Sequence, residues 1–425
     1  MKERLKSLLL LLLVAGSLVQ SYYLIYRLPG SDTAAKATNT YIKTDNMGPQ
    51  QRIENMVYPD KMLIHMGEGK HTVFYPNSTF YKLIYARLKG RSFENFQRES
   101  VENVDWNKIR TEHPGIELTF GAGIPVSLLE RVMQIQPDSL FGAERINRIW
   151  IYNAPSESKT HALFFSTQGD VMYEAAKVDL TVQDVQQHVD FGKNWIPYSM
   201  QNGGAYYVPE KPLDVVEADL EIGSYTVAQM QQSLFFDPGI TRYIREKDGS
   251  EIYTDSKRSL QVRQEQKWMS YTDPAAPPAG ESSDSKDMLA AVDFVNEHGG
   301  WNGEYRVDLS SVGVGQNQVA FQQYFGSYPV LDTPGFHYGK MKLDLQQGNV
   351  STYERSLIYM KPGQSKQVKK LPAGNGLKPM LFAISKDSPI EDLYPAYLPK
   401  LDEGKLKLAP VWAVKLANGQ IRTIR

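Results

Sequence analysis

The sequence of 425 residues contains no cysteine. A chain without cysteine forms no disulfide, holds no metal through thiolates and carries no cysteine-linked lipid. Its formal net charge is −1, so the chain lacks the excess of positive charge that is typical of nucleic-acid-binding proteins. Charged residues make up 22% and hydrophobic residues 41%, which indicates a folded globular protein rather than a disordered chain.

The common catalytic signatures are also missing. The chain has no Gly-x-Ser-x-Gly motif, no His-Glu-x-x-His motif and no P-loop. Its seven histidines are scattered, without a pair at metal-ligand spacing. Gly313-Val-Gly315 lacks the third glycine of a dinucleotide-binding fingerprint, and His298-Gly-Gly-Trp301 indicates a helix end packed by tryptophan. We therefore expect no catalytic residue, no cofactor and no metal, and we predict that the protein is not an enzyme.

Four acidic residues lie close together at Asp214, Glu217, Asp219 and Glu221. The last three alternate along the chain, so in a strand they share one face. A calcium site needs about six to eight oxygens at converging geometry, which this spacing does not supply. We interpret these residues as the solvated face of a strand.

A long apolar run stands at the N-terminus. Lys2, Arg4 and Lys6 precede residues 7–26, which carry no charge and include six consecutive leucines. At about 1.5 Å per residue this run forms a helix of roughly 30 Å, the thickness of a bilayer core. The basic leader predicts a cytoplasmic N-terminus and a body outside the cytoplasm, anchored in the cell membrane by one helix. The alternative is a signal peptide cleaved after Ser17, although the apolar run continues past that residue.

One stripe of the predicted helix carries small and polar residues. Ser17 and Ser21 form a small-xxx-small arrangement that lets two helices approach closely, and Gln20 could donate a hydrogen bond across such a contact. A glutamine in hydrocarbon is costly unless it is satisfied. We therefore predict an interface with a partner helix in the membrane, formed by Gly16, Ser17, Gln20, Ser21 and Leu24. The alternatives are that Gln20 reaches the membrane surface, or that the small residues merely reflect a composition similar to signal peptides.

The remaining chain predicts an α+β body of antiparallel sheets with packed helices. Its absence of cysteine fits an exported protein of bacteria that do not rely on disulfides, such as many Gram-positives. Changes in composition and loop-forming residues predict the following organisation: a cytoplasmic leader 1–6, a transmembrane helix 7–27, a tether 28–47, an N-terminal α+β domain 48–205, a middle α+β domain 206–272 and a C-terminal α+β domain 286–425.

Several local patterns predict individual elements. Capping boxes predict helices that begin near Ser127, Thr181, Thr226 and Ser388. Met288, Leu289, Val292 and Val295 lie on one helical face, and Gly299-Gly300 ends the helix. Ala417-Asn-Gly419 predicts a hairpin turn. Alternating apolar runs predict strands at 148–152, 162–165, 305–309, 318–324, 340–345 and 351–358.

Some runs resemble a known family. They are Tyr253-Thr-Asp255 with Leu260-Gln-Val262, Ala291-Val-Asp-Phe-Val-Asn-Glu-His-Gly-Gly-Trp301, and Gly348-Asn-Val-Ser-Thr-Tyr-Glu-Arg355. Together with the single anchor, they are similar to the YycH (WalH) family of regulatory proteins. The resemblance implies a three-domain body without a reaction of its own. It also implies association, through membrane helices, with the YycG (WalK) sensor kinase that controls cell-wall metabolism and with the related protein YycI.

We therefore expect a membrane-anchored accessory regulator of a two-component kinase. Two alternatives stay open: an extracytoplasmic protein that binds a cell-wall fragment or peptide, and an anchored hydrolase. A compact cleft with converging polar groups and shifted titratable residues favours either alternative.

Overall fold

The computed structural model describes residues 6, 13–17, 20, 47–102, 104–154, 157–265, 267–274, 283–311, 317–333, 335–346 and 348–425. The chain forms two compact units, Met1–Lys43 and Thr44–Arg425. In the first unit, residues 13–17 and 20 are helical and exposed. No helix among the described residues is long and apolar enough to cross a membrane. Most of the span predicted at 7–27 lies outside the described residues.

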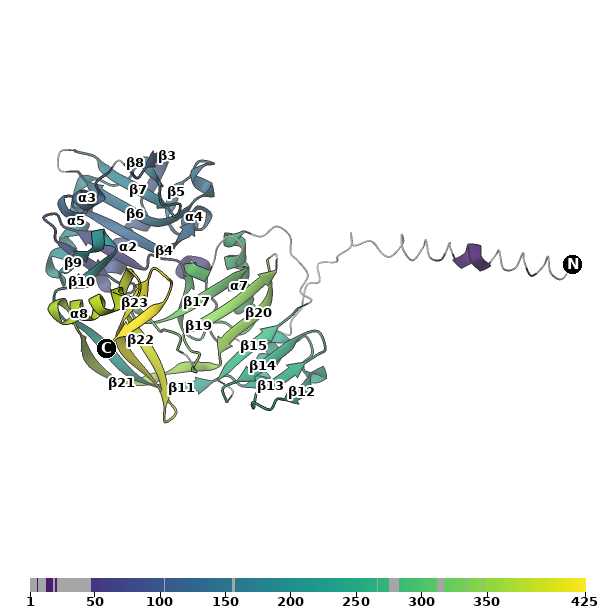
Figure 1. Cartoon of the computed structure of the whole chain (residues 1–425). Helices are drawn as coiled ribbons and strands as arrows, with labels where there is room; N and C mark the ends of the chain where they lie inside the picture. The colour runs from purple at the N-terminus through teal and green to yellow at the C-terminus, as the bar shows by residue number, and fades with distance from the viewer. Residues whose placement is uncertain are drawn as a thin grey trace. The chain divides into compact units, whose positions relative to one another are not determined.

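The second unit begins with a ten-stranded sheet, here called the N-terminal sheet (Figure 1). All neighbours in it are antiparallel except β3 and β5. In spatial order its strands are β10 (Tyr206–Pro209), β9 (Tyr198–Gln201), β2 (His71–Phe74), β1 (Lys61–His65), β4 (Gly115–Pro125), β6 (Arg145–Asn153), β7 (Thr160–Ser166), β8 (Val171–Val178), β3 (Ser92–Ser100) and β5 (Gln134–Gln136).

Two further sheets are interleaved in the sequence. The C-terminal sheet has the order β21 (Ile358–Leu371), β11 (Leu213–Ser224), β23 (Lys405–Leu416) and β22 (Ile390–Asp402), with β24 (Ile421–Ile424) beside β23. The central sheet has the order β12 (Arg242–Arg245), β13 (Glu251–Thr254), β14 (Ser259–Arg263), β15 (Trp268–Thr272), β20 (Asn349–Ser356), β19 (Lys340–Gln346), β17 (Gln318–Phe325) and β16 (Glu304–Asp308), with β18 (Tyr328–Pro329) beside β17.

The central sheet is thus an insertion between β11 and β21. Ser224 and Ile358 are paired across these two strands, and the backbone N–H of Tyr225 donates to Leu357 O at 2.9 Å. The strands of the segment 206–272 are consequently shared between sheets, because β11 joins the C-terminal sheet and β12–β15 join the central one. The domain borders expected from the sequence stay a prediction.

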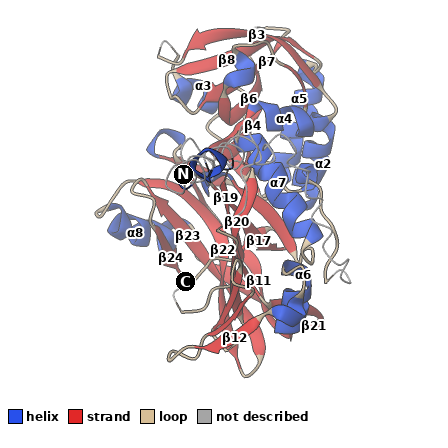
Figure 2. Ribbon diagram, turned by 90° about the vertical axis from the view of Figure 1, so that its right-hand side faces the viewer, coloured by secondary structure: helices blue, strands red, loops and turns tan. Residues whose placement is uncertain are grey.

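Helices cover the sheets on their apolar sides (Figure 2). The helices are α2 (Thr79–Lys89), α3 (Trp106–Glu112), α4 (Val126–Val132), α5 (Val182–Asp190), α6 (Val227–Leu234), α7 (Asp284–Glu297) and α8 (Gly374–Ser385). Helices α4 and α5 pack on the N-terminal sheet, α7 on the central sheet, and α8 against β10 and β22. One continuous core joins the N-terminal and central sheets, and a separate core lies in the C-terminal sheet around Trp412.

The start of the second unit is fixed to the end of α7. Met47 O accepts a hydrogen bond from the Tyr225 hydroxyl at 2.8 Å. The backbone N–H of Trp301 donates to Pro49 O at 3.2 Å, and Asn296 exchanges two hydrogen bonds with the backbone of Gln51. Segment 47–51 is therefore held by the central sheet and its helix rather than by the neighbouring N-terminal sheet.

Most predicted elements are present. Thr181 and Thr226 form complete capping boxes at the starts of α5 and α6. Met288, Val292 and Val295 are buried in α7 together with Ala291, whereas Leu289 is only half-buried; the helix ends before Gly299 and Gly300, both at positive φ. The predicted strands correspond to β6, β7, β16, β17, β19 and β20, and the Ala417-Asn-Gly419 turn joins β23 to β24.

Two capping-box predictions are wrong. Helix α4 is present, but its N-cap is Pro125, two residues before the expected Ser127, and it has no side-chain cap; Ser127 instead contacts Ser285. The Ser388 pattern precedes a strand, because β22 pairs with β23 from Ile390 to Asp402. Twelve ladder pairs and the burial of this strand outweigh one local capping pattern. The α+β class is confirmed.

Candidate functional site

The predicted helix interface is described only in part. Gly16, Ser17 and Gln20 are helical and exposed, like the other described residues of 13–17. Ser21 and Leu24 lie outside the described residues. The interface therefore stays a prediction, and the site described below is a different one, within Thr44–Arg425.

A cavity of about 570 Å³ lies where the three sheets meet. Its walls come from the start of β1, the bend within β4, the ends of β16, β17 and β19, and the strands β22–β24. This volume falls within the roughly 300–1,000 Å³ of small-ligand sites. The lining combines polar groups with Tyr75, Phe120, Tyr324, Tyr394 and Leu398.

Ion pairs join the sheets around this cavity. Arg306 of the central sheet donates to Asp60 Oδ1 and to Tyr58 O, both at 2.6 Å, beside the N-terminal sheet. Lys61 of β1 pairs with Asp392 of β22 in the C-terminal sheet. Arg306 is almost fully buried, so water does not screen its charge strongly. The cavity is thus held between sheets by charge-assisted contacts.

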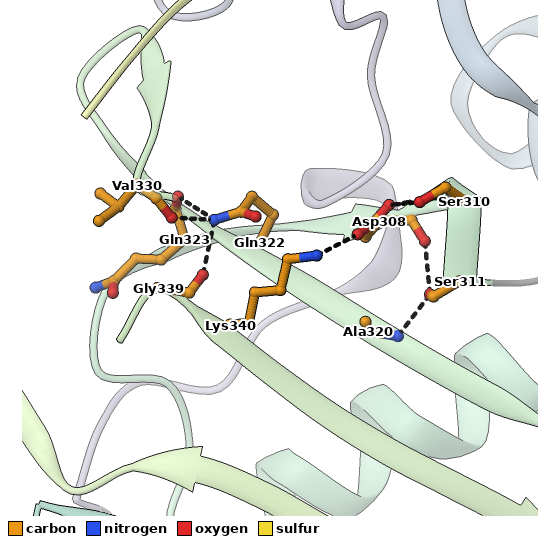
Figure 3. A network of polar contacts seen from close by, with 9 residues as sticks. All are labelled: Asp308, Ser310, Ser311, Ala320, Gln322, Gln323, Val330, Gly339 and Lys340. Carbon is orange, nitrogen blue, oxygen red and sulfur yellow. Dashed lines mark hydrogen bonds and ion pairs between the residues drawn. The ribbon is translucent and has the colours of Figure 1, made fainter. Parts of the chain in front are cut away.

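A second network lies on the wall formed by the central sheet (Figure 3). Lys340 Nζ donates to Asp308 Oδ2 at 3.1 Å, and Ser310 N and Oγ donate to Asp308 Oδ1. Gln322, directly opposite Lys340 in the ladder, donates through Nε2 to Val330 O and to Gly339 O. These bonds orient the Gln322 amide group and leave its carbonyl oxygen as an acceptor beside an ammonium donor.

Burial shifts the titration of several lining groups. Burial raises the pKa of Asp60, and the nearby Arg306 opposes this shift; the carboxylate remains 40% exposed toward the cavity, and solvent there limits the shift. For Asp308, burial acts in the same direction, but Lys340 and the Ser310 hydrogen bonds outweigh it and the pKa is lowered. Burial also raises the pKa of Tyr324 and of Tyr394, which therefore stay protonated donors.

The arrangement is suited to binding. Its polar groups converge on one space, and each lining cation is paired with a carboxylate. Among the described residues, no group of three His, Asp or Glu side chains could hold a metal ion. The cavity therefore has the features of a recognition site for a polar molecule of modest size.

A second polar cluster is buried inside the N-terminal sheet. Glu117 forms ion pairs with Arg148, whose Nε lies 3.0 Å away, and with Arg110, whose Nε lies 3.5 Å away. Its Oε2 lies 3.0 Å from His65 Nε2. The two Nδ1 atoms of His65 and His71 are 3.0 Å apart. Burial would raise the pKa of Glu117, but the arginines and His65 hold it far below its ordinary value. This cluster fills the space under β10 and has no adjoining cavity large enough to hold a ligand among those described.

The acidic residues of β11 lie along a strand with basic partners. Glu217 pairs with Lys407 at 3.2 Å, and Asp219 and Glu221 stand opposite Lys407 and Lys405 of β23. Glu221 is exposed, and Glu217 and Asp219 are half-buried. Asp214 is exposed. These positions agree with a solvated strand face.

The sequence did not point to the cavity. Its residues range from Asp60 to Thr423 and share no motif. The one signal is Arg306, which stands among the alternating residues of a predicted strand, where a charge is expected to face solvent. An alternation pattern cannot tell a solvent-facing arginine from one buried against another sheet.

Known proteins are similar to this chain in sequence and in architecture. Residues 3–191 match the N-terminal domain of YycH protein, and residues 204–425 match its C-terminal domain. The two-component system WalR/WalK regulatory protein YycH of Bacillus subtilis (strain 168) is 21% identical over 443 residues, which cover 99% of this chain and 96% of that protein. The crystal structure of YycH from Bacillus subtilis superposes with a TM-score of 0.70 at 18% identity, covering 90% of this chain and 99% of that one. With one family domain matched across its first half and another across its second, the chain belongs to the YycH family.

Proposed function

We propose that this chain is a membrane-anchored, non-catalytic regulator of a WalK (YycG) sensor kinase, acting with YycI through contacts between membrane helices. The observation that carries this proposal is the family match over both halves of the chain. A relative that aligns over 99% of the chain is named a regulatory protein of the WalR/WalK system. The charge-free run 7–26 and its basic leader supply the anchor and place the body outside the cytoplasm.

The proposed mechanism is that the membrane helix contacts the two signalling states of the kinase with different affinity. A helix that binds one signalling state of the kinase better than the other shifts the equilibrium toward that state. The size of the effect is set by the difference in contact free energy, and either sign is physically allowed. The stripe around Gln20 is the surface proposed to make this contact, because its small residues permit close approach.

The anchor exchange tests this function. Residues 7–26 are replaced by an unrelated apolar helix of equal length, and phosphorylation of the response regulator is measured in cells that make the variant at parental level. We expect kinase output to shift to that of cells lacking the protein. Output equal to that of the parent would rule out the helix-contact mechanism.

A narrower variant tests the stripe itself. Ser17→Leu with Gln20→Leu should weaken co-purification with the kinase and YycI while the chain stays in the membrane fraction. The matched control, Ala15→Leu with Val19→Leu, alters the opposite side of the same helix. Equal co-purification of the two double variants would contradict the proposed interface.

The cavity supports a second role beside kinase regulation, namely the binding of a small molecule. Converging polar groups are expected of a binding protein or a hydrolase. Asp60, Asp308 and Asp392 are each held in an ion pair with a cation, and Lys340 and Ser310 lower the pKa of Asp308, which does not favour Asp308 as a general acid. Binding, rather than hydrolysis, is the role that these contacts support.

A further inference from the structure

The charge balance of the cavity restricts its ligand. Four acidic side chains, Asp60, Asp308, Asp332 and Asp392, and four basic ones, Lys61, Arg306, Lys340 and Lys415, contribute to the lining. Asp60, Asp308 and Asp392 pair with Arg306, Lys340 and Lys61, Lys415 pairs with Glu391, and Asp332 contacts the imidazole of His337. A charged ligand, or a free peptide with its two charged ends, would have to displace one of these pairs, at a cost of desolvating the partner left behind. An uncharged ligand meets no such cost.

The available hydrogen-bonding groups are of both kinds. The Asp60 side chain is 40% exposed and offers carboxylate oxygens that accept hydrogen bonds. The Tyr324 hydroxyl accepts from Arg306 Nη1 at 3.0 Å, which directs its own proton elsewhere. Gln322 presents a carbonyl oxygen beside Lys340 Nζ (Figure 3). Donors next to acceptors match hydroxyl groups, which are both, and amides, which carry one of each.

The apolar part of the lining supplies flat surfaces. Tyr324 and Tyr394 are partly exposed beside Leu398, and Ile421 lies on β24 at the same cavity. Aromatic rings next to polar groups suit ligands that combine C–H faces with hydroxyls at their edges. Sugar rings have this combination.

From these observations we propose that the cavity between the three sheets binds an uncharged saccharide that carries N-acetyl groups. The acetamide lies between Gln322 and Lys340, and ring hydroxyls donate to the exposed carboxylate of Asp60. The ligand would touch all three sheets at once and stabilise their mutual arrangement by mass action. This site goes beyond the proposed kinase regulation and does not depend on the membrane helix.

The experiment measures binding directly. The full chain in detergent is titrated with N,N′-diacetylchitobiose by calorimetry and by ligand-observed NMR. Cellobiose serves as the disaccharide without amides, the glucosamine dimer as the cationic one, and Ala-Ala as the zwitterionic peptide. We expect the diacetylated sugar to bind most tightly. No binding of it, or tighter binding of Ala-Ala or of the glucosamine dimer, would overturn the assignment.

Two variants place the ligand. Thr423→Trp fills the cavity from β24, whereas the control Arg422→Trp changes the neighbouring residue, whose side chain points to the opposite side of the same strand. The first should weaken binding by at least about tenfold and the second should not, since a filled pocket loses its ligand contacts. Equal affinities would mean that the sugar binds elsewhere.

The amide contact has its own variant. Lys340→Met keeps the length of the side chain and removes its donor, so the preference for diacetylchitobiose over cellobiose should fall by about tenfold while cellobiose binding stays the same. An unchanged preference would contradict the acetamide position. Thermal melts of each variant check its folding. Because none of these assays involves the kinase, a negative result leaves the proposed regulation standing, and loss of regulation leaves the site standing.

Discussion

At the scale of single residues, His71 in β2 and His298 at the end of α7 are both buried. His71 packs beside His65 and Glu117, and His298 closes the end of α7 with its Nδ1 2.7 Å from Phe294 O. Burial lowers the pKa of each to about 4, and for His71 the nearby His65 adds to this shift. In the unfolded chain a histidine takes up its proton near pH 6.5. Between these values the unfolded state binds more protons than the folded one.

The stability of the protein should therefore fall as the pH is lowered from about 6.5 to 4. Each of these histidines contributes a loss on the order of 2 kcal/mol over this window. The free energy of unfolding in urea, followed by tryptophan fluorescence at pH 7, 5.5 and 4.5, measures the loss. His298→Gln keeps a donor at that position and removes the titration. The free energy of unfolding of this variant should therefore fall less with decreasing pH than that of the parent. Parallel pH profiles of the variant and the parent would contradict the assignment.

At the scale of elements, segment 47–51 fits the end of α7 closely. Gly48 lies so near Trp301 that a Cβ there would stand 2.0 Å from Trp301 O, and one at Gly300 would stand 2.4 Å from Gly48 O. Gly300 also has a φ of +76°, which favours glycine. Glycine at these positions permits the two backbones to approach.

Gly48→Ala should therefore detach the segment. We expect a loss of stability of about 1–3 kcal/mol from the forced shift, together with faster amide exchange at Gln51 and Trp301. Gly376→Ala is the matched control, because no atom lies within 4 Å of its Cβ position in α8. Unchanged exchange at Gln51 and Trp301 in Gly48→Ala would show that the contact is not needed to hold the segment.

The elements also show what sequence patterns can predict. Helices α5, α6 and α7 follow from capping boxes and one apolar face, because local hydrogen bonds and local burial agree there. Helix α8 was missed because it contains Gly374, Gly376 and Pro379, which are poor helix formers. Strand β22 was missed because its pairing with β23 is non-local. The cavity could not be predicted for the same reason, since it depends on how three sheets come together.

At the scale of the whole molecule, β11 depends on strands made much later in the chain. It pairs with β21 on one side and with β23 on the other. Its buried residues Leu213, Val215 and Leu220 belong to the core around Trp412. The C-terminal sheet therefore has no stable part made of the chain before Ile358.

A chain that ends after Leu357 should consequently aggregate, because β11 keeps both edges unpaired and its apolar residues exposed. The control ends after Ala417 and removes only β24, an edge strand, so it should stay folded with a lower melting temperature. Size-exclusion chromatography and thermal melts in detergent distinguish these results. A shorter chain that is monodisperse and melts cooperatively would contradict the expected dependence.

The insertion of the central sheet between β11 and β21 also determines the order in which the three sheets can form during synthesis. A chain delivered N-terminus first presents β11 before residues 225–357 and before either of its partners exists. The N-terminal sheet, whose strands all precede β11, can close during this interval, and domains generally fold as units in the order of their synthesis. The cavity needs all three sheets, so it is completed only when β22–β24 arrive. The anchor that we propose at the N-terminus would thus be made well before the cavity is complete.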